Sequence, residues 1–198
     1  MWPPKRRQTR RGTGRPAGVL LHLGPGLGNG LANLHNARKA HSGIVNIVGE
    51  HAIHHLAFDA PLTADIEGVA RPMSNWVHTS RSSQAVARDG ARAITEARTA
   101  PGRIATLILP ADTAWNPGGE VCTADAPPAR APFDEQALEA AARALESLAP
   151  QAGRCALLLG GIGTLDTALT WAGRIAARTH NISGADPAFV QRVRAVLA

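Results

Sequence analysis

The residues best suited to chemistry form a glycine-rich turn. Residues 21–30 read LHLGPGLGNG, and five of these ten positions are glycine or proline. They follow directly on the apolar run 17–20. A bare main chain between a strand and a helix lets something approach it closely. The composition of the turn leaves a phosphate, a flat ring or a neighbouring helix as the group that approaches.

Phosphate binding by this turn has little support from its spacing. The dinucleotide pattern G-x-G-x-x-G, begun at Gly24, requires a glycine where the chain has Asn29. Begun at Gly26, the pattern requires a glycine where the chain has Leu31. The P-loop pattern G-x-x-x-x-G-K-[ST] does not occur either.

Three histidines within five residues, His51, His54 and His55, are the candidate metal ligands. Imidazoles bind zinc or copper, but apart from Glu50 no carboxylate or cysteine lies at ligand spacing. We therefore interpret them as solvent-exposed loop histidines and predict no metal ligands. The serines of residues 80–83 lack the G-x-S-x-G pattern of a hydrolase nucleophile, so no catalytic residue is predicted there.

The charge of the chain is concentrated at its beginning. The formal net charge is +6, and six cations lie within residues 5–15, so the remainder is close to neutral. Such an arm can attract nucleic acid electrostatically, but it carries no recognition motif. We predict no specific nucleic-acid binding, and we rank a role in nucleic-acid binding through the arm last.

The remaining composition indicates a protein of the cytoplasm. The chain has 198 residues, 44% of them hydrophobic, and no apolar stretch of membrane-spanning length. Cys122 and Cys155 form neither a metal-spaced pair nor a disulfide framework, which favours a reducing compartment. No apolar segment of the kind found in secretory signals follows the arginine-rich start.

Hydrophobic patterning predicts an α/β fold. Short apolar runs alternate with segments of helical spacing, and continuous apolar strands of this kind indicate a parallel sheet covered by helices on both faces. The predicted strands are 19–23, 44–48, 76–79 and 104–109, and the predicted helices are 27–40, 65–70 and 82–98.

Composition also divides the chain into segments. Residues 1–14 read as a disordered basic arm, 15–112 as an α/β domain, 113–131 as a proline- and glycine-rich linker, and 132–198 as the start of a second α/β unit. In that second unit we predict helices 134–148, 165–178 and 188–197 and a strand at 155–159.

Residues 15–112 resemble the pyrimidine-binding domain of thiamine-diphosphate-dependent enzymes of the acetolactate synthase large-subunit group, without its N-terminal part. Residues 134–178 resemble the opening of that family's central domain. The likeness rests on an ordered set of short motifs: Gly24-Pro25-Gly26 with Asn29, Ile47-Val48-Gly49, Asp59-Ala60, Ala64-Asp65, Arg71-Pro72 and the strand end at 106–112.

The resemblance implies thiamine diphosphate and Mg²⁺ as cofactors, a small 2-oxo acid as substrate, and a homo-oligomer. The implied chemistry is 2-oxo acid decarboxylation and carboligation, with the cofactor as electron sink. In the family the G-P-G turn approaches the aminopyrimidine ring of the cofactor. It therefore implies Gly24, Pro25, Gly26 and Asn29 as cofactor-binding residues.

The departures from the family pattern predict a truncated, catalytically incomplete form. The family places an activating glutamate upstream of the turn and holds diphosphate and Mg²⁺ through a G-D-G…N motif, and this sequence has neither. Glu50 and Leu62 replace two glutamines expected from the family. The alternative is a non-catalytic α/β binding or regulatory module that keeps the fold without the chemistry.

Overall fold

The chain forms two units, Met1–Ala129 and Arg130–Ala198. The computed structural model describes residues 15–129, 132–148, 156–160, 163, 166–179 and 182–183. The predicted basic arm at 1–14 and the predicted helix at 188–197 lie outside these residues.

A four-stranded parallel sheet is the centre of the first unit. Its strands are β1 (Ala17–His22), β2 (Ile44–Glu50), β3 (Trp76–Thr79) and β4 (Ile104–Pro110), in the order β1-β2-β4-β3. All three pairings are parallel. The predicted parallel α/β fold is confirmed.

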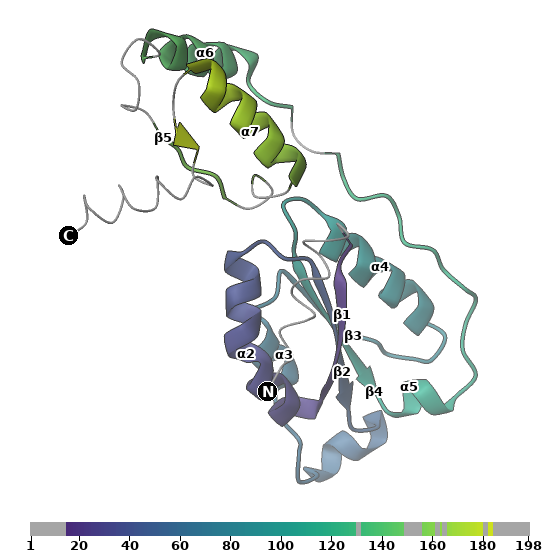
Figure 1. Ribbon diagram of the computed structural model, residues 1–198. Coiled ribbons are helices and arrows are strands. Elements are labelled where there is room, and N and C mark those ends of the chain that lie inside the picture. The colour runs from purple at the N-terminus through teal and green to yellow at the C-terminus, as the bar shows by residue number, and fades with distance from the viewer. Residues whose placement is uncertain are drawn as a thin grey trace, which may run out of the picture. The chain divides into compact units, whose positions relative to one another are not determined.

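Helices cover both faces of this sheet, as Figure 1 shows. Helices α2 (Leu23–Lys39) and α3 (Ile66–Ala70) pack together on one face, and α4 (Val86–Arg98) packs on the other. The strand order explains this division. The connections from β1 to β2 and from β2 to β3 run in one direction along the sheet, and the connection from β3 to β4 runs back. Since crossovers are right-handed, the reversal moves the helix to the opposite face.

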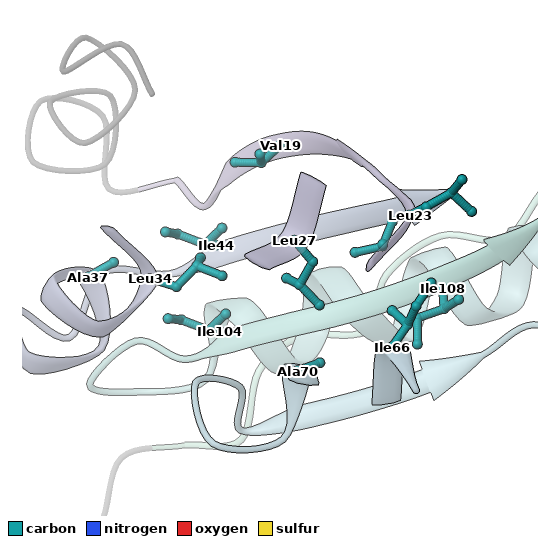
Figure 2. Close-up of a cluster of buried hydrophobic side chains, with 11 residues drawn as sticks. Val19, Leu23, Leu27, Leu34, Ala37, Ile44, Ile66, Ala70, Ile104 and Ile108 are labelled. Atoms are coloured by element: carbon teal, nitrogen blue, oxygen red, sulfur yellow. The ribbon is translucent and has the colours of Figure 1, made fainter. Parts of the chain in front are cut away.

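The larger hydrophobic core lies between the sheet and the pair of helices α2 and α3 (Figure 2). Leu27 and Leu34 of α2 are fully buried there, against Val48, Ile104 and Ile108 of the sheet. The core beneath α4 is smaller and rich in alanine, with Ala93, Ala97, Ala105 and Leu107. Small side chains there let α4 lie close to the strands.

Two buried polar networks fix the strands within the first unit. The Asn46 amide donates to the Thr106 hydroxyl at 3.0 Å, and that hydroxyl is 2.7 Å from the Ser74 hydroxyl. At the end of β3, the buried Ser80 hydroxyl donates to the Asp89 carboxylate of α4 at 2.8 Å. These contacts satisfy polar groups that would otherwise be costly to bury.

Two helix starts differ from the sequence prediction. The predicted strand 19–23 ends at His22, and the predicted helix 27–40 already begins at Leu23. The predicted helix 82–98 begins only at Val86, because residues 83–85 form a turn. The Ser83 hydroxyl in this turn donates to the Pro117 carbonyl at 2.7 Å.

Part of the predicted linker 113–131 belongs structurally to the first unit. The short helix α5 (Asp112–Trp115) follows β4 directly. Beyond it, the Gln84 amide donates to the Pro117 carbonyl at 3.3 Å, and the Thr95 hydroxyl donates to the Asp125 carbonyl at 3.3 Å. These contacts attach the segment to the α4 region, which proline and glycine content did not indicate.

The second unit contains α6 (Glu135–Leu148), β5 (Ala156–Leu157), α7 (Asp166–Thr179) and β6 (Ile182–Ser183). The Asp134 carboxylate accepts from two backbone amides at the start of α6, as expected of a helix cap. Strands β5 and β6 pair in parallel. In the part of the chain that is described, no helix has both the length and the apolar character needed to cross a bilayer.

Candidate functional site

The candidate site begins where β1 passes into α2 without any linking residue. His22 is the last residue of β1, and Leu23 is the first of α2. Leu23 takes a φ of 54°, in the left-handed region that side chains rarely adopt. Its side chain is 5% exposed and belongs to the core (Figure 2), so packing holds this strained conformation in place.

Gly24 is where a neighbouring segment approaches the main chain. A Cβ atom on Gly24 would lie 2.6 Å from the Cβ of Ala64, much closer than two carbon atoms can come. Ala64 belongs to the loop between the 3₁₀ helix η1 (Ile53–Phe58) and α3. Gly24 itself is buried. Because Gly24 has no side chain, there is room beside it for Ala64 of the same protein.

At the start of α2, the solvent-facing side is formed by Pro25, Gly28 and Asn29. All three residues are exposed, and their spacing places them on one side of the helix. A Cβ on Gly28 would meet no atom within 4 Å. Gly26 is half-buried, and a Cβ there would lie 3.4 Å from the Cβ of His22. The exposed surface therefore offers the rigid ring of Pro25, the uncovered main chain of Gly28 and the side-chain amide of Asn29.

Replacing Gly24 by alanine should destabilise the first unit by about 1 kcal/mol. Overpacking against Ala64 costs roughly 1 to 3 kcal/mol, and the better helix propensity of alanine offsets part of it. Chemical denaturation followed by circular dichroism measures the change. The double variant Gly24→Ala with Ala64→Gly should recover most of the loss.

Gly28→Ala is the matched control on the same helix. It has open space around the new methyl group, so it should stabilise the unit by up to about 1 kcal/mol. If Gly24→Ala proved as favourable as Gly28→Ala, the close approach of Ala64 would be refuted.

The other strand ends lie at the same edge of the sheet as the turn. The register aligns His22 with Gly49 and Glu50 with Pro110. The Glu50 carboxylate accepts from the His51 amide at 2.7 Å, and the Asp112 carboxylate accepts from the Ile53 amide at 3.2 Å. The loops after β2 and β4 are thereby tied together. In open parallel sheets, ligands bind outside the carboxyl ends of the strands.

The histidines of residues 51–55 are not assembled as a ligand set. The rings of His54 and His55 lie 4.5 Å apart, while the Nε2 atom of His51 is buried without a hydrogen-bond partner in the structure. Within residues 15–129 and the described parts of the second unit, no three side chains of histidine, cysteine, aspartate or glutamate are grouped to hold a metal ion.

The exposed residues of α2 fit a flat heteroaromatic ring. A proline offers a rigid apolar face, and a primary amide can both donate to and accept from ring substituents. Gly24, Pro25, Gly26 and Asn29 were predicted from the sequence, whereas Gly28 was not, although it lies three residues after Pro25 on the same side of the helix.

Comparison with known protein families and sequences gives three likenesses. Residues 8–71 match the N-terminal TPP binding domain of thiamine pyrophosphate enzymes. The chain is 45% identical over 167 residues to a Mycobacterium tuberculosis protein named "Putative acetolactate synthase large subunit IlvX", covering 84% of this chain and 31% of the relative. It is 34% identical over 101 residues to benzoylformate decarboxylase of Pseudomonas aeruginosa, covering 50% of this chain and 19% of that protein. The chain thus spans less than a third of the length of these relatives.

Solved structures share the fold. The thiamine diphosphate-dependent 4-hydroxybenzoylformate decarboxylase of Rhodococcus jostii RHA1 matches with a TM-score of 0.73 and 21% identity, over 90% of this chain and 34% of that one. Benzoylformate decarboxylase of Polynucleobacter necessarius matches with a TM-score of 0.64 and 23% identity, over 78% of this chain and 28% of that one. Residues 8–71 thus belong to the family of N-terminal TPP binding domains of thiamine pyrophosphate enzymes, the chain is similar in sequence to the putative acetolactate synthase large subunit and to benzoylformate decarboxylase, and the solved structures share its fold.

Proposed function

We propose that the first unit is the pyrimidine-side cofactor domain of an acetolactate synthase-like enzyme, which decarboxylates and joins 2-oxo acids. The observation that carries the proposal is the exposed face formed by Pro25, Gly28 and Asn29 at the carboxyl edge of the sheet. This face lies inside the segment that matches the family's cofactor-binding domain.

Each residue of the turn has a physical role in this proposal. Pro25 offers its ring as a flat apolar contact, and Asn29 provides the hydrogen bonds that orient the aminopyrimidine. Gly26 and Gly28 have no side chains, so the aminopyrimidine ring can approach the main chain closely. Gly24 acts indirectly, by letting the loop at Ala64 support the start of α2. When bound, the cofactor supplies the electron sink for decarboxylation.

We further propose that these 198 residues are catalytically incomplete by themselves. Diphosphate and Mg²⁺ contribute much of a cofactor's affinity through charge-assisted contacts, and the family's G-D-G…N motif is missing from the sequence. The described residues support only the ring-side contacts. The alternative, a non-catalytic binding or regulatory module, predicts no recognition of the ring at all.

Titration of the chain with thiamine and with thiamine diphosphate tests both proposals. We expect both ligands to bind weakly, and Mg²⁺ to leave both affinities unchanged, because the turn holds only the ring. Asn29→Ala should weaken both by about fivefold, the equivalent of one hydrogen bond. Asn36→Ala, an exposed asparagine later in α2, should leave both affinities unchanged. Isothermal titration calorimetry measures the constants.

Four results would contradict these proposals. Binding that is unchanged in Asn29→Ala would refute the ring-side assignment, and failure of thiamine to bind at all would favour the non-catalytic alternative. A Mg²⁺-dependent preference of tenfold or more for the diphosphate, or CO₂ release from pyruvate by the chain alone, would refute the catalytic incompleteness.

We also propose a homo-oligomer located in the cytoplasm. In η1, the side chains of Ile53, Leu56 and Phe58 are exposed, Phe58 by 78%, and such apolar surface is typical of interfaces. The exposed free Cys122 is compatible with a reducing compartment.

The variant Phe58→Ser should shift the assembly toward monomer in size-exclusion chromatography with light scattering. Val121→Ser, which alters a side chain that is 95% exposed elsewhere in the first unit, should leave the assembly unchanged. A monomeric parent chain at tens of micromolar would contradict the proposal.

A further inference from the structure

A second candidate site lies at the amino edge of the sheet, opposite the glycine-rich turn. It is a cavity of about 720 Å³ at the loops that lead into β2, β3 and β4. Small-molecule sites have volumes of this order. Asn29 and Lys39 lie ten residues apart on α2, which corresponds to about 15 Å along the helix axis. The cavity is therefore separate from the proposed ring-binding face.

The wall of this amino-edge cavity is strongly cationic. Arg38, Lys39 and Arg103 line it together with His35 and His41, and no aspartate or glutamate is among its lining residues. The Arg38 guanidinium donates to the backbone carbonyl of Pro72, which leaves its charge uncompensated. Lys39 has no ion pair within the described part of the chain.

Only one of the three cations has an acidic partner. The Arg103 guanidinium lies 3.2 Å from the Glu96 carboxylate, which is also 2.6 Å from Arg92 outside the cavity. One carboxylate thus serves two arginines. The C-terminal end of α2 carries partial negative charge, which explains the cations in the last turn of this helix. It does not explain Arg103, which lies on the loop before β4, or the lack of aspartate and glutamate among the described residues that line the cavity.

The walls of the cavity are held in place by backbone contacts. His41 takes a φ of 49° and Gly102 a φ of 129°, conformations that turn the chain sharply at both loops. The Ile44 amide donates to the Arg103 carbonyl at 3.0 Å, which joins these loops. The Asn75 side-chain oxygen accepts from the Ile104 amide at 3.0 Å, so its NH₂ group remains available as a donor.

We propose that this cavity binds a small phosphorylated molecule of about nucleoside diphosphate size. Arginine and lysine together are the usual partners of phosphate, arginine through its forked donors and lysine as a point charge. The Asn75 amide adds a neutral donor. Met73 and Pro101, which also line the cavity, offer apolar surface for the organic part of the ligand.

Titration of the ¹⁵N-labelled full chain with ADP, followed by NMR, tests this proposal. We expect saturable shifts of the backbone amides of residues 38–41, 73–75 and 102–104. Lys39→Glu and Arg103→Gln should each weaken ADP binding by tenfold or more. Arg143→Gln, which removes an exposed cation from the second unit, should have no effect. Pyrophosphate should compete with ADP, and adenosine should not.

Specific results would overturn the proposal. Shifts confined to the basic residues 5–15, or equal losses in Lys39→Glu and Arg143→Gln, would show non-specific attraction to net charge. Competition by adenosine alone would refute recognition through phosphate. Lys39→Glu is a substitution at an exposed helix position, so its circular dichroism should match the parent and loss of binding cannot be assigned to unfolding. Asn29→Ala should leave ADP affinity unchanged, which separates this site from the proposed cofactor face.

Discussion

Replacing Leu27 by alanine should lower the free energy of unfolding of the first unit by about 3 kcal/mol. Leu27 is fully buried in the core between α2 and the sheet (Figure 2), so the substitution removes apolar contacts and leaves a cavity. It also lies one turn after the start of α2, directly beneath the exposed residues Pro25 and Asn29. Urea denaturation monitored by circular dichroism gives the free energy, and weaker thiamine binding should accompany the loss.

Leu20→Ala provides the matched control. The same side chain is removed, but Leu20 is 77% exposed on the edge strand β1 and makes no contribution to the buried cluster. We expect a change within about 0.5 kcal/mol. Equal effects of the two leucine substitutions would show that α2 does not pack on the sheet as described.

Replacing Asp89 by alanine should cost about 2 to 3 kcal/mol. Asp89 is 6% exposed, and its loss leaves the completely buried Ser80 hydroxyl without its carboxylate acceptor. His78 and Arg88 also approach this carboxylate, at 3.2 and 3.5 Å. Because the Arg88 side chain is 76% exposed and the His78 side chain 42% exposed, we expect little of the loss to come from these two contacts. The same urea denaturation measures the effect.

A double-mutant cycle isolates the Ser80 contribution. In the Asp89→Ala background, Ser80→Ala should cost much less than in the parent chain, because the hydroxyl has already lost its partner. Asp89→Asn keeps an acceptor oxygen and should retain part of the stability. Glu120→Ala, which alters an exposed acid of the first unit, should change little. Additive effects of the Ser80 and Asp89 substitutions would refute the coupling.

The sequence predicted the parallel sheet because its strands are short, continuous apolar runs, which are typical of strands covered on both faces. Residues 104–109 illustrate this, since Ile104 and Ile108 point into the larger core while Ala105 and Leu107 point into the smaller one. The order of the strands was beyond such reasoning. The placement of β3 outside β4 depends on crossover direction, which hydrophobic periodicity does not encode.

The glycine-rich turn could be located from the sequence, but its geometry could not be predicted. The glycine-rich turn marked the end of β1. Local composition could not show that the space beside Gly24 is occupied by the side chain of Ala64, forty residues further along the chain. Nor could it predict the left-handed conformation of Leu23, which burial in the core imposes on a residue that would otherwise avoid it. The sequence did not predict the cationic cavity, because Arg38 and Lys39 lie in α2 whereas Arg103 lies on the loop before β4.

The direct passage from β1 into α2 has a consequence for the thermodynamics of recognition. With no residue between His22 and Leu23, Pro25 and Asn29 can move only together with the sheet. A flexible loop must lose conformational freedom when it closes on a ligand, at roughly 1 to 2 kcal/mol for each residue that becomes fixed. Here that entropy is already lost when the protein folds, so even a few weak contacts with a flat ring translate into measurable affinity.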